Sequence, residues 1–109
     1  MNDSYGRVAA AIPANTNEAE LYQVPTGMAF VGVLNICNET ANTPAYSVAL
    51  TLTSTAAITK DWLAFGISLE ANIAHTMKVF LNAAQTIRIK SSAADEISFV
   101  LQGLLIDNR

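Results

Sequence analysis

Apolar and polar residues alternate with a period of two along most of this chain. No stretch of eleven or more residues shows the three-to-four-residue apolar spacing of a helix. Period-two alternation sends successive side chains to opposite faces of a strand, so it predicts β-structure. About eight strands are expected, at residues 8–12, 20–24, 28–38, 46–54, 61–69, 75–81, 87–91 and 97–106. The predicted fold class is therefore all-β.

The length of the chain limits how these strands are arranged. Eight strands of about eight residues, with connections of about four or five, use nearly all of the 109 residues. There is no room for a second core. A single antiparallel two-sheet β-sandwich, resembling a jelly roll, is the economical arrangement. We expect one domain over residues 1–109, with residues 1–7 as a flexible N-terminal arm.

The strand expected at residues 28–38 is apolar on both faces, which is typical of a central strand covered on both sides. The other strands each have one mainly apolar row that is predicted to face inward. The predicted core takes large side chains from these rows, namely Phe30, Leu34, Leu50, Phe65, Val79, Ile89 and Phe99.

A hairpin is predicted between residues 75–81 and 87–91. A five-residue connection over residues 82–86 pairs Leu81 with Ile87, whereas a four-residue connection would mix the apolar and polar faces. The accepted register places Lys78 opposite Lys90, next to Arg88. We expect these three cations to form one basic face that docks on carboxylates of a partner protein or a neighbouring subunit. The alternative is that the long side chains extend separately into water.

Composition favours a subunit of an assembly. Charged residues make up 14% of the chain, against roughly 25% in an ordinary soluble domain, and hydrophobic residues make up 51%. A surface with so little charge is expected to be partly covered by neighbours. The formal net charge of −3 argues against nucleic-acid and membrane partners. The first seven residues show no secretory signal, which predicts synthesis in a cytoplasm.

Residues that could carry chemistry are few. The chain has one histidine and one cysteine, and no cluster has the spacing of metal ligands. His75 and Cys37 are read as structural residues. Trp62 is either a binding platform or a residue that packs against a neighbouring strand or subunit. No phosphate-binding loop or nucleophile motif is present, so we expect no catalytic activity, no metal and no cofactor.

Several segments carry a resemblance to a known family. They are residues 19–27 (AELYQVPTG), 36–38 (ICN), 61–65 (DWLAF), 69–72 (LEAN), 80–89 (FLNAAQTIRI) and 97–103 (ISFVLQG). Over residues 15–107 this order resembles small β-sandwich virion proteins of tailed bacteriophages. The "Leu-Tyr-x-Val-Pro-x-Gly" piece is its most specific part. The sequence departs from the pattern at Gln85, where Gly-Asp is expected.

The resemblance implies a structural virion component without catalytic residues. It implies a capsid cement or decoration protein, forming a homotrimer and binding the major capsid protein or another virion protein. The protein would then be assembled in the host cytoplasm and located in the virion. The alternative function is a module of a tail, baseplate or fibre that binds another protein or a host glycan. The residues predicted to form an interface are Lys78, Arg88, Lys90 and Trp62.

Overall fold

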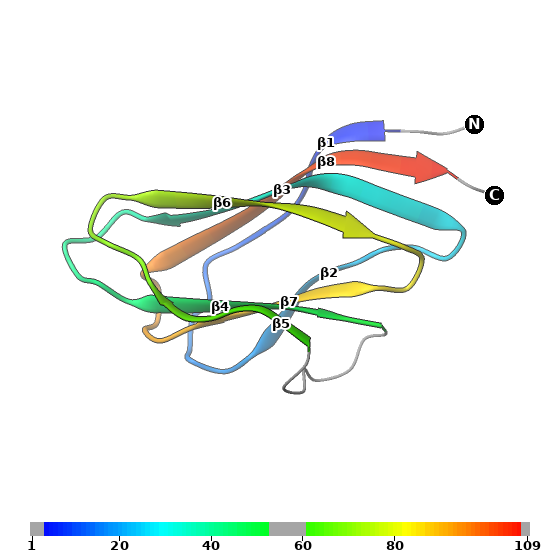
Figure 1. The fold of residues 1–109 in the computed structure, drawn as a ribbon. Helices are drawn as coiled ribbons and strands as arrows, with labels where there is room; N and C mark the ends of the chain where they lie inside the picture. The colour runs from blue at the N-terminus through cyan, green and yellow to red at the C-terminus, as the bar shows by residue number, and fades with distance from the viewer. Residues whose placement is uncertain (1–3, 53–60, 108–109) are drawn as a thin grey trace.

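The computed structural model describes residues 4–52 and 61–107. These residues form eight strands, which confirms the predicted all-β sandwich (Figure 1). In chain order the strands are β1 (Ser4–Ala11), β2 (Ala19–Gln23), β3 (Met28–Asn38), β4 (Ala45–Thr51), β5 (Trp62–Ser68), β6 (Ala74–Leu81), β7 (Thr86–Ser91) and β8 (Ile97–Asp107). Within the described ranges there is no helix of the length and hydropathy needed to cross a membrane.

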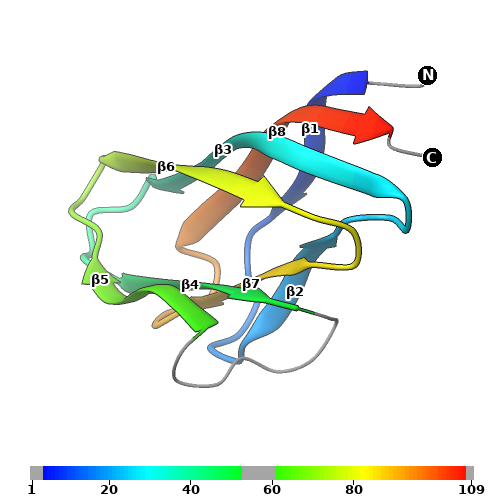
Figure 2. The ribbon, with the colours of Figure 1, turned by 45° about the vertical axis from the view of Figure 1, so that its right-hand side comes forward.

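The strands form two antiparallel sheets that pack face to face. Sheet A has the order β1-β8-β3-β6, and sheet B has the order β2-β7-β4-β5. Only β4 and β5 are neighbours both in the chain and in a sheet, while every other connection crosses to the opposite sheet. This is the strand order of a jelly roll. Figure 2 shows its consequence, which is that β5 and β6 lie on one side of the sandwich and β1 and β2 on the other.

The core lies between the two sheets and is built from the inward rows of their strands. Of the predicted core residues, Phe30, Leu34, Val79, Ile89 and Phe99 are buried, and Leu50 packs half-buried at the margin of the core. β3 is central, between β8 and β6, and pairs with both without a register shift. Its outward row, which includes Val31 and Val33, is half-buried rather than fully covered as predicted.

The prediction that Phe65 lies in the core is wrong, because this side chain is 62% exposed. The pairing of β5 with β4 shifts register twice, between Tyr46 and Val48 and again between Val48 and Ala49. Each shift inserts an extra residue in β5 and breaks the alternation on which the prediction depended. Gly66, at φ 63°, lies within the first shift, and its N–H donates to Ser47 Oγ at 2.9 Å.

The predicted hairpin is also wrong, because β6 and β7 lie in different sheets. β6 pairs with β3, and β7 pairs with β2 and β4. The four residues between them, 82–85, carry the chain across the sandwich and are held by backbone hydrogen bonds to Val24. The apolar rows of β6 and β7 both face the core, one from each sheet. Their alternation in the sequence is therefore compatible with a hairpin and with strands in opposite sheets.

Two further features lie at the ends of strands, and the first differs from the predicted flexible N-terminal arm. Residues 4–7 of the predicted flexible arm belong to β1 and pair with residues 102–105 of β8. At the end of β3, Asn38 is fully buried, and its Nδ2 donates to the carbonyl oxygens of Asn42, Leu69 and Glu70 at 2.8, 3.1 and 3.2 Å. Asn38 therefore joins the β3–β4 and β5–β6 connections.

Candidate functional site

The three predicted interface cations do not share one face. Lys78 lies on the outer face of sheet A, whereas Arg88 and Lys90 lie on the outer face of sheet B, because the buried residues Ile87 and Ile89 of β7 face the core. Arg88 already has a carboxylate partner, since its Nε donates to Glu18, and both side chains are largely buried. The single basic face is thus contradicted by the fold. That Lys78, Arg88 and Lys90 each contact a partner protein stays a prediction.

Trp62 begins β5 and lies at the edge of sheet B. It pairs with Ala49, is partly buried, and meets Phe65 edge to face, with ring centroids 5.0 Å apart and an interplanar angle of 69°. Trp62 therefore packs against a residue of its own strand. The exposed Phe65, which the sequence placed in the core, is the more accessible aromatic side chain.

His75 and Cys37 have positions that suit a structural role. His75 is half-buried on the inward row of β6, and its Nδ1 lies 3.0 Å from the Tyr46 hydroxyl of sheet B. This hydrogen bond links the two sheets. Burial raises the pKa of the Tyr46 hydroxyl above its ordinary value. Cys37 lies on the outward row of β3 and is half-buried.

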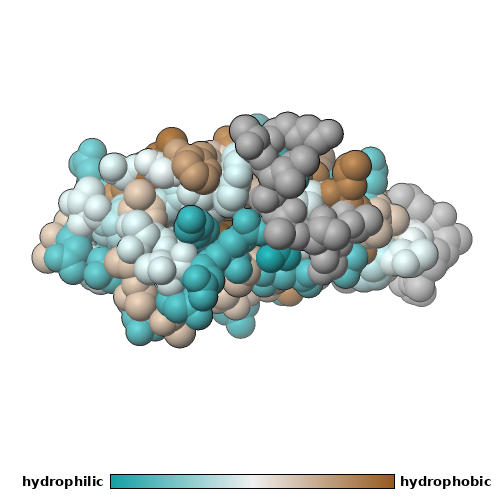
Figure 3. All heavy atoms as spheres, turned by 90° about the horizontal axis from the view of Figure 1, so that it is seen from below, coloured by the Kyte–Doolittle hydropathy of each residue, from teal (hydrophilic) through white to brown (hydrophobic). Residues whose placement is uncertain are grey.

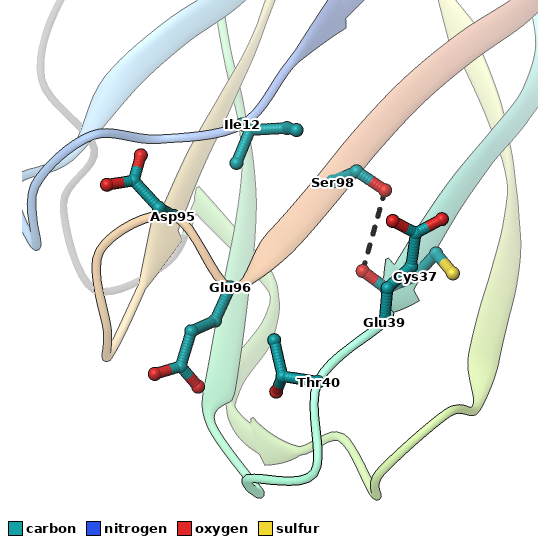
Figure 4. Close-up of a pocket in the computed structure, with 7 residues that line it drawn as sticks. All are labelled: Ile12, Cys37, Glu39, Thr40, Asp95, Glu96 and Ser98. Atoms are coloured by element: carbon teal, nitrogen blue, oxygen red, sulfur yellow. Dashed lines mark hydrogen bonds between the residues drawn. The ribbon is translucent and has the colours of Figure 1, made fainter.

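A cleft of about 250 Å³ lies where β3 and β8 meet the loops at one end of the sandwich. It is lined by Ile12, Cys37, Glu39, Thr40, Asp95, Glu96 and Ser98 (Figure 4). The three carboxylates point in different directions in this view rather than toward one centre. Among the described residues, no group of three or more His, Cys, Asp or Glu side chains could hold a metal ion.

Beside this cleft runs a more open groove of about 420 Å³, which we call the β1–β8 groove. It is lined by Ala10, Ala11, Ile12, Ser98, Phe99 and Val100. Ala10 pairs with Val100, and both face outward because the adjacent Phe99 and Leu101 are buried in the core. The small side chain of Ala10 leaves this outward surface open, whereas Ala11, which pairs with Phe99, packs against the core. The sequence signal of the groove is the run Ala9-Ala10-Ala11, which lies beside an apolar strand.

A second apolar region lies on the opposite side of the sandwich. Leu63, Phe65 and Ile67 of β5 are 53%, 62% and 40% exposed, and we call them the β5 surface. Figure 3, which looks onto sheet B, shows coloured apolar atoms mainly along one edge of this face and polar atoms over its middle. Sequence reasoning missed this surface, because a regular alternation along β5 would bury these three residues.

No protein-family model and no curated protein matches the sequence. Two solved structures from infectious bursal disease virus share the arrangement of strands. One is the Gx strain virus, at a TM-score of 0.50 and 14% identity, covering 96% of this chain and 32% of the other. The other is the VP2 subviral particle, at 0.50 and 14%, covering 94% and 31%. This chain shares its fold with these two structures.

The chain spans about a third of the length of those two viral chains. A pentameric capsid protein isolated from metagenomic phage sequences matches with a TM-score of 0.37 and 17% identity, over 97% of this chain and 60% of that one.

Proposed function

We propose that this chain is a structural protein of a tailed-phage virion, acting as a capsid cement or decoration protein. The observation that carries the proposal is the jelly-roll strand order, which covers 94% of this chain in its match to the VP2 subviral particle. Jelly rolls recur in viral capsids, but they serve other functions too, so the surface of the chain has to support the proposal as well.

The surface favours a role in assembly. Large apolar side chains are exposed on β5, and an open apolar groove lies between β1 and β8. Only 14% of all residues are charged. Exposed apolar surface rimmed by polar residues marks protein–protein contact. In this proposal the chain is a non-catalytic subunit that binds the major capsid protein. It forms homo-oligomers, and the trimer is our working hypothesis.

A second function is supported by one observation, the aromatic pair on β5. Phe65 is 62% exposed and lies against Trp62, and exposed aromatic rings are suited to stack on sugars. A tail, baseplate or fibre module that binds a host glycan or another tail protein would use such a pair. This function predicts few copies per particle.

The test is the number of copies in purified virions, measured by quantitative mass spectrometry against the major capsid protein. A cement or decoration protein should be present in hundreds of copies and should be detected on heads by antibody labelling in electron micrographs. A handful of copies with label on tails would favour the second function. Absence of the protein from purified particles would contradict both.

A further inference from the structure

The two sheets differ in the faces that they turn away from the core. The outward rows of the central strands of sheet B, β4 and β7, are mainly polar or charged and include Ser47, Thr51 and Lys90. The outward rows of the central strands of sheet A, β3 and β8, are mainly aliphatic, with Ala29, Val31, Val33, Val100, Leu104 and Ile106. An antiparallel sheet with one face in water usually turns polar residues outward. The outer face of sheet A departs from this pattern.

The aliphatic side chains of this face continue onto the edge strand β6. Val31 pairs with Leu104 of β8 and with Phe80 of β6, so these three side chains lie side by side across the sheet. Val31 and Leu104 are half-buried, and Phe80 is 68% exposed. Figure 1 and Figure 2 show no described segment of the chain lying across this face. Exposed apolar surface of this kind marks a contact with another protein.

The next row on the same face carries positive charge at both ends. Val33 pairs with Lys78 of β6 and with Gln102 of β8, and Gln102 pairs with Arg7 of β1. Arg7 and Lys78 therefore lie at opposite edges of the sheet, separated by three strand spacings or about 14 Å. Both side chains are exposed, and within the described ranges neither has a carboxylate partner.

No carboxylate offsets these two cations on the face. The four strands of sheet A contain one acidic residue, Asp107, and its side chain is buried at the end of the inward row of β8. The chain as a whole has a formal net charge of −3, yet this face is positive. Sheet B differs here too, because Arg88 on its outer face is paired with Glu18.

The charge pattern selects the kind of partner. A second copy packed through the same face would bring Arg7 and Lys78 close to their counterparts, and like charges brought together oppose association. Two cations beside an aliphatic strip are too few for a nucleic acid, whose binding typically uses about 6–10 phosphate contacts. The complementary surface is that of another protein, with an apolar strip flanked by carboxylates about 14 Å apart.

The face is large enough for a specific contact. β3 and β8 have 11 residues each and β1 and β6 have eight, which gives lengths of about 36 and 26 Å for strands spaced about 4.8 Å apart. The face therefore offers on the order of 600 Å², and a contact over all of it buries about 1,200 Å² in total, within the range of specific interfaces. Because exposed ion pairs add little affinity, the apolar strip binds and the cations set the orientation.

We propose that the outer face of sheet A is the surface by which this chain docks on the major capsid protein, at a site where carboxylates flank an apolar strip. Phe80, Val31 and Leu104 form the apolar centre of the contact, and Arg7 and Lys78 meet the carboxylates. The inference rests on the proposed function, because it names the surface that a capsid cement or decoration protein would use.

Binding to empty shells, assembled from the major capsid protein of the same virus without this chain, tests the surface. Co-sedimentation gives the dissociation constant, and Phe80→Asp and Lys78→Glu should each raise it at least ten-fold. Phe65→Asp and Lys90→Glu are the matched controls, because Phe65 is 62% exposed on β5 and Lys90 lies on the outer face of sheet B. Both controls should stay within two-fold of the unchanged protein. Circular dichroism establishes that each variant is folded.

Salt dependence tests the two cations separately from the apolar strip. Raising the salt concentration from about 50 to about 500 mM screens exposed ion pairs, so the unchanged protein should lose several-fold in affinity for the shells. A variant with both Arg7→Ala and Lys78→Ala should bind more weakly at low salt and should lose less than two-fold over the same range. An equal salt response of the two proteins would contradict the role of the cations.

Three results would overturn the inference. They are equal losses in the sheet A and sheet B variants, no binding of the unchanged protein to the shells, and an oligomer that Phe80→Asp converts to monomer without weakening shell binding. The last result would make the face a contact between copies. The number of copies in virions tests the proposed function independently. Hundreds of copies bound through sheet B would contradict the inference alone, and shell binding through sheet A by a protein absent from virions would contradict the function alone.

Discussion

β3 and β5 are both apolar strands of similar composition, yet the fold uses them in opposite ways. β3 is central, pairs on both edges in continuous register and buries its inward row completely. β5 is an edge strand whose register with β4 shifts twice, and it exposes Leu63, Phe65 and Ile67. An apolar residue therefore stabilises the core in β3 and is available for association in β5. The two strands differ because β3 has a neighbouring strand on each side, whereas β5 has one on a single side.

The largest difference between the strands should come from their phenylalanines. Phe30 of β3 is fully buried, so Phe30→Ala should reduce the free energy of unfolding by about 3–5 kcal/mol. Phe65 of β5 is 62% exposed, and Phe65→Ala should cost less than about 1 kcal/mol. Urea denaturation of both variants measures the difference. Equal losses would show that β5 is packed as tightly as β3.

The second-largest difference in stability should come from substitutions at the glycines of the two strands. A Cβ added at Gly32 of β3 would lie 2.2 Å from the Gln102 carbonyl oxygen and 2.6 Å from Phe30 Cζ. Gly32→Ala should therefore cost about 3 kcal/mol, because backbone of β8 would have to move. Gly66 of β5 has nothing within 4 Å of its added Cβ, so Gly66→Ala should cost only the roughly 1–2 kcal/mol of a left-handed conformation at φ 63°. A smaller loss at Gly32 than at Gly66 would contradict the close approach of β3 and β8.

A third effect concerns the end of β3. Asn38→Ala would remove the donor to three carbonyl oxygens and the acceptor of the Thr40 N–H, at 2.9 Å, so we expect a loss of about 2 kcal/mol. Asn35→Ala, on the half-buried outward row of the same strand, is the control and should stay within about 0.5 kcal/mol of the unchanged protein. Thermal unfolding of the two variants is the measurement. If both lose the same stability, the buried hydrogen bonds of Asn38 do not hold the two connections together.

The smallest expected effect is on the pH dependence of stability, and it involves Tyr46 of β4. Tyr46 pairs with Ile67 of β5, and burial raises the pKa of its hydroxyl, as burial also does for Tyr22. A raised pKa means that the unfolded chain releases the tyrosine protons first. The stability linked to these groups is therefore present below about pH 10 and is lost as pH rises through the folded-state pKa values. Tyr46→Phe should flatten this alkaline loss in urea midpoints taken from pH 8 to pH 11. An unchanged slope would show that Tyr46 does not contribute to it.

The candidate surfaces show where local pattern stops being informative. The residue types of the β5 surface and of the groove are visible in the sequence, as a strand without charge and as a run of alanines. Their exposure is not visible, because it depends on the bulges of β5 and on which strands lie at the edges. The prediction of one basic face was wrong for a similar reason. The rows of β6 and β7 match equally well side by side in a hairpin and face to face across a core.

Hydrophobic alternation by itself determined the all-β class, the positions of the strands apart from the start of β1, the central place of β3 and most of the large core residues. These follow from local spacing, because side chains two residues apart share a face of a strand whatever the strand pairs with. Only the tertiary structure decided which strands pair, that β6 and β7 lie in opposite sheets, and that Phe65 faces outward. Those outcomes depend on hydrogen bonds and packing between residues far apart in the chain, where several arrangements bury the same apolar rows.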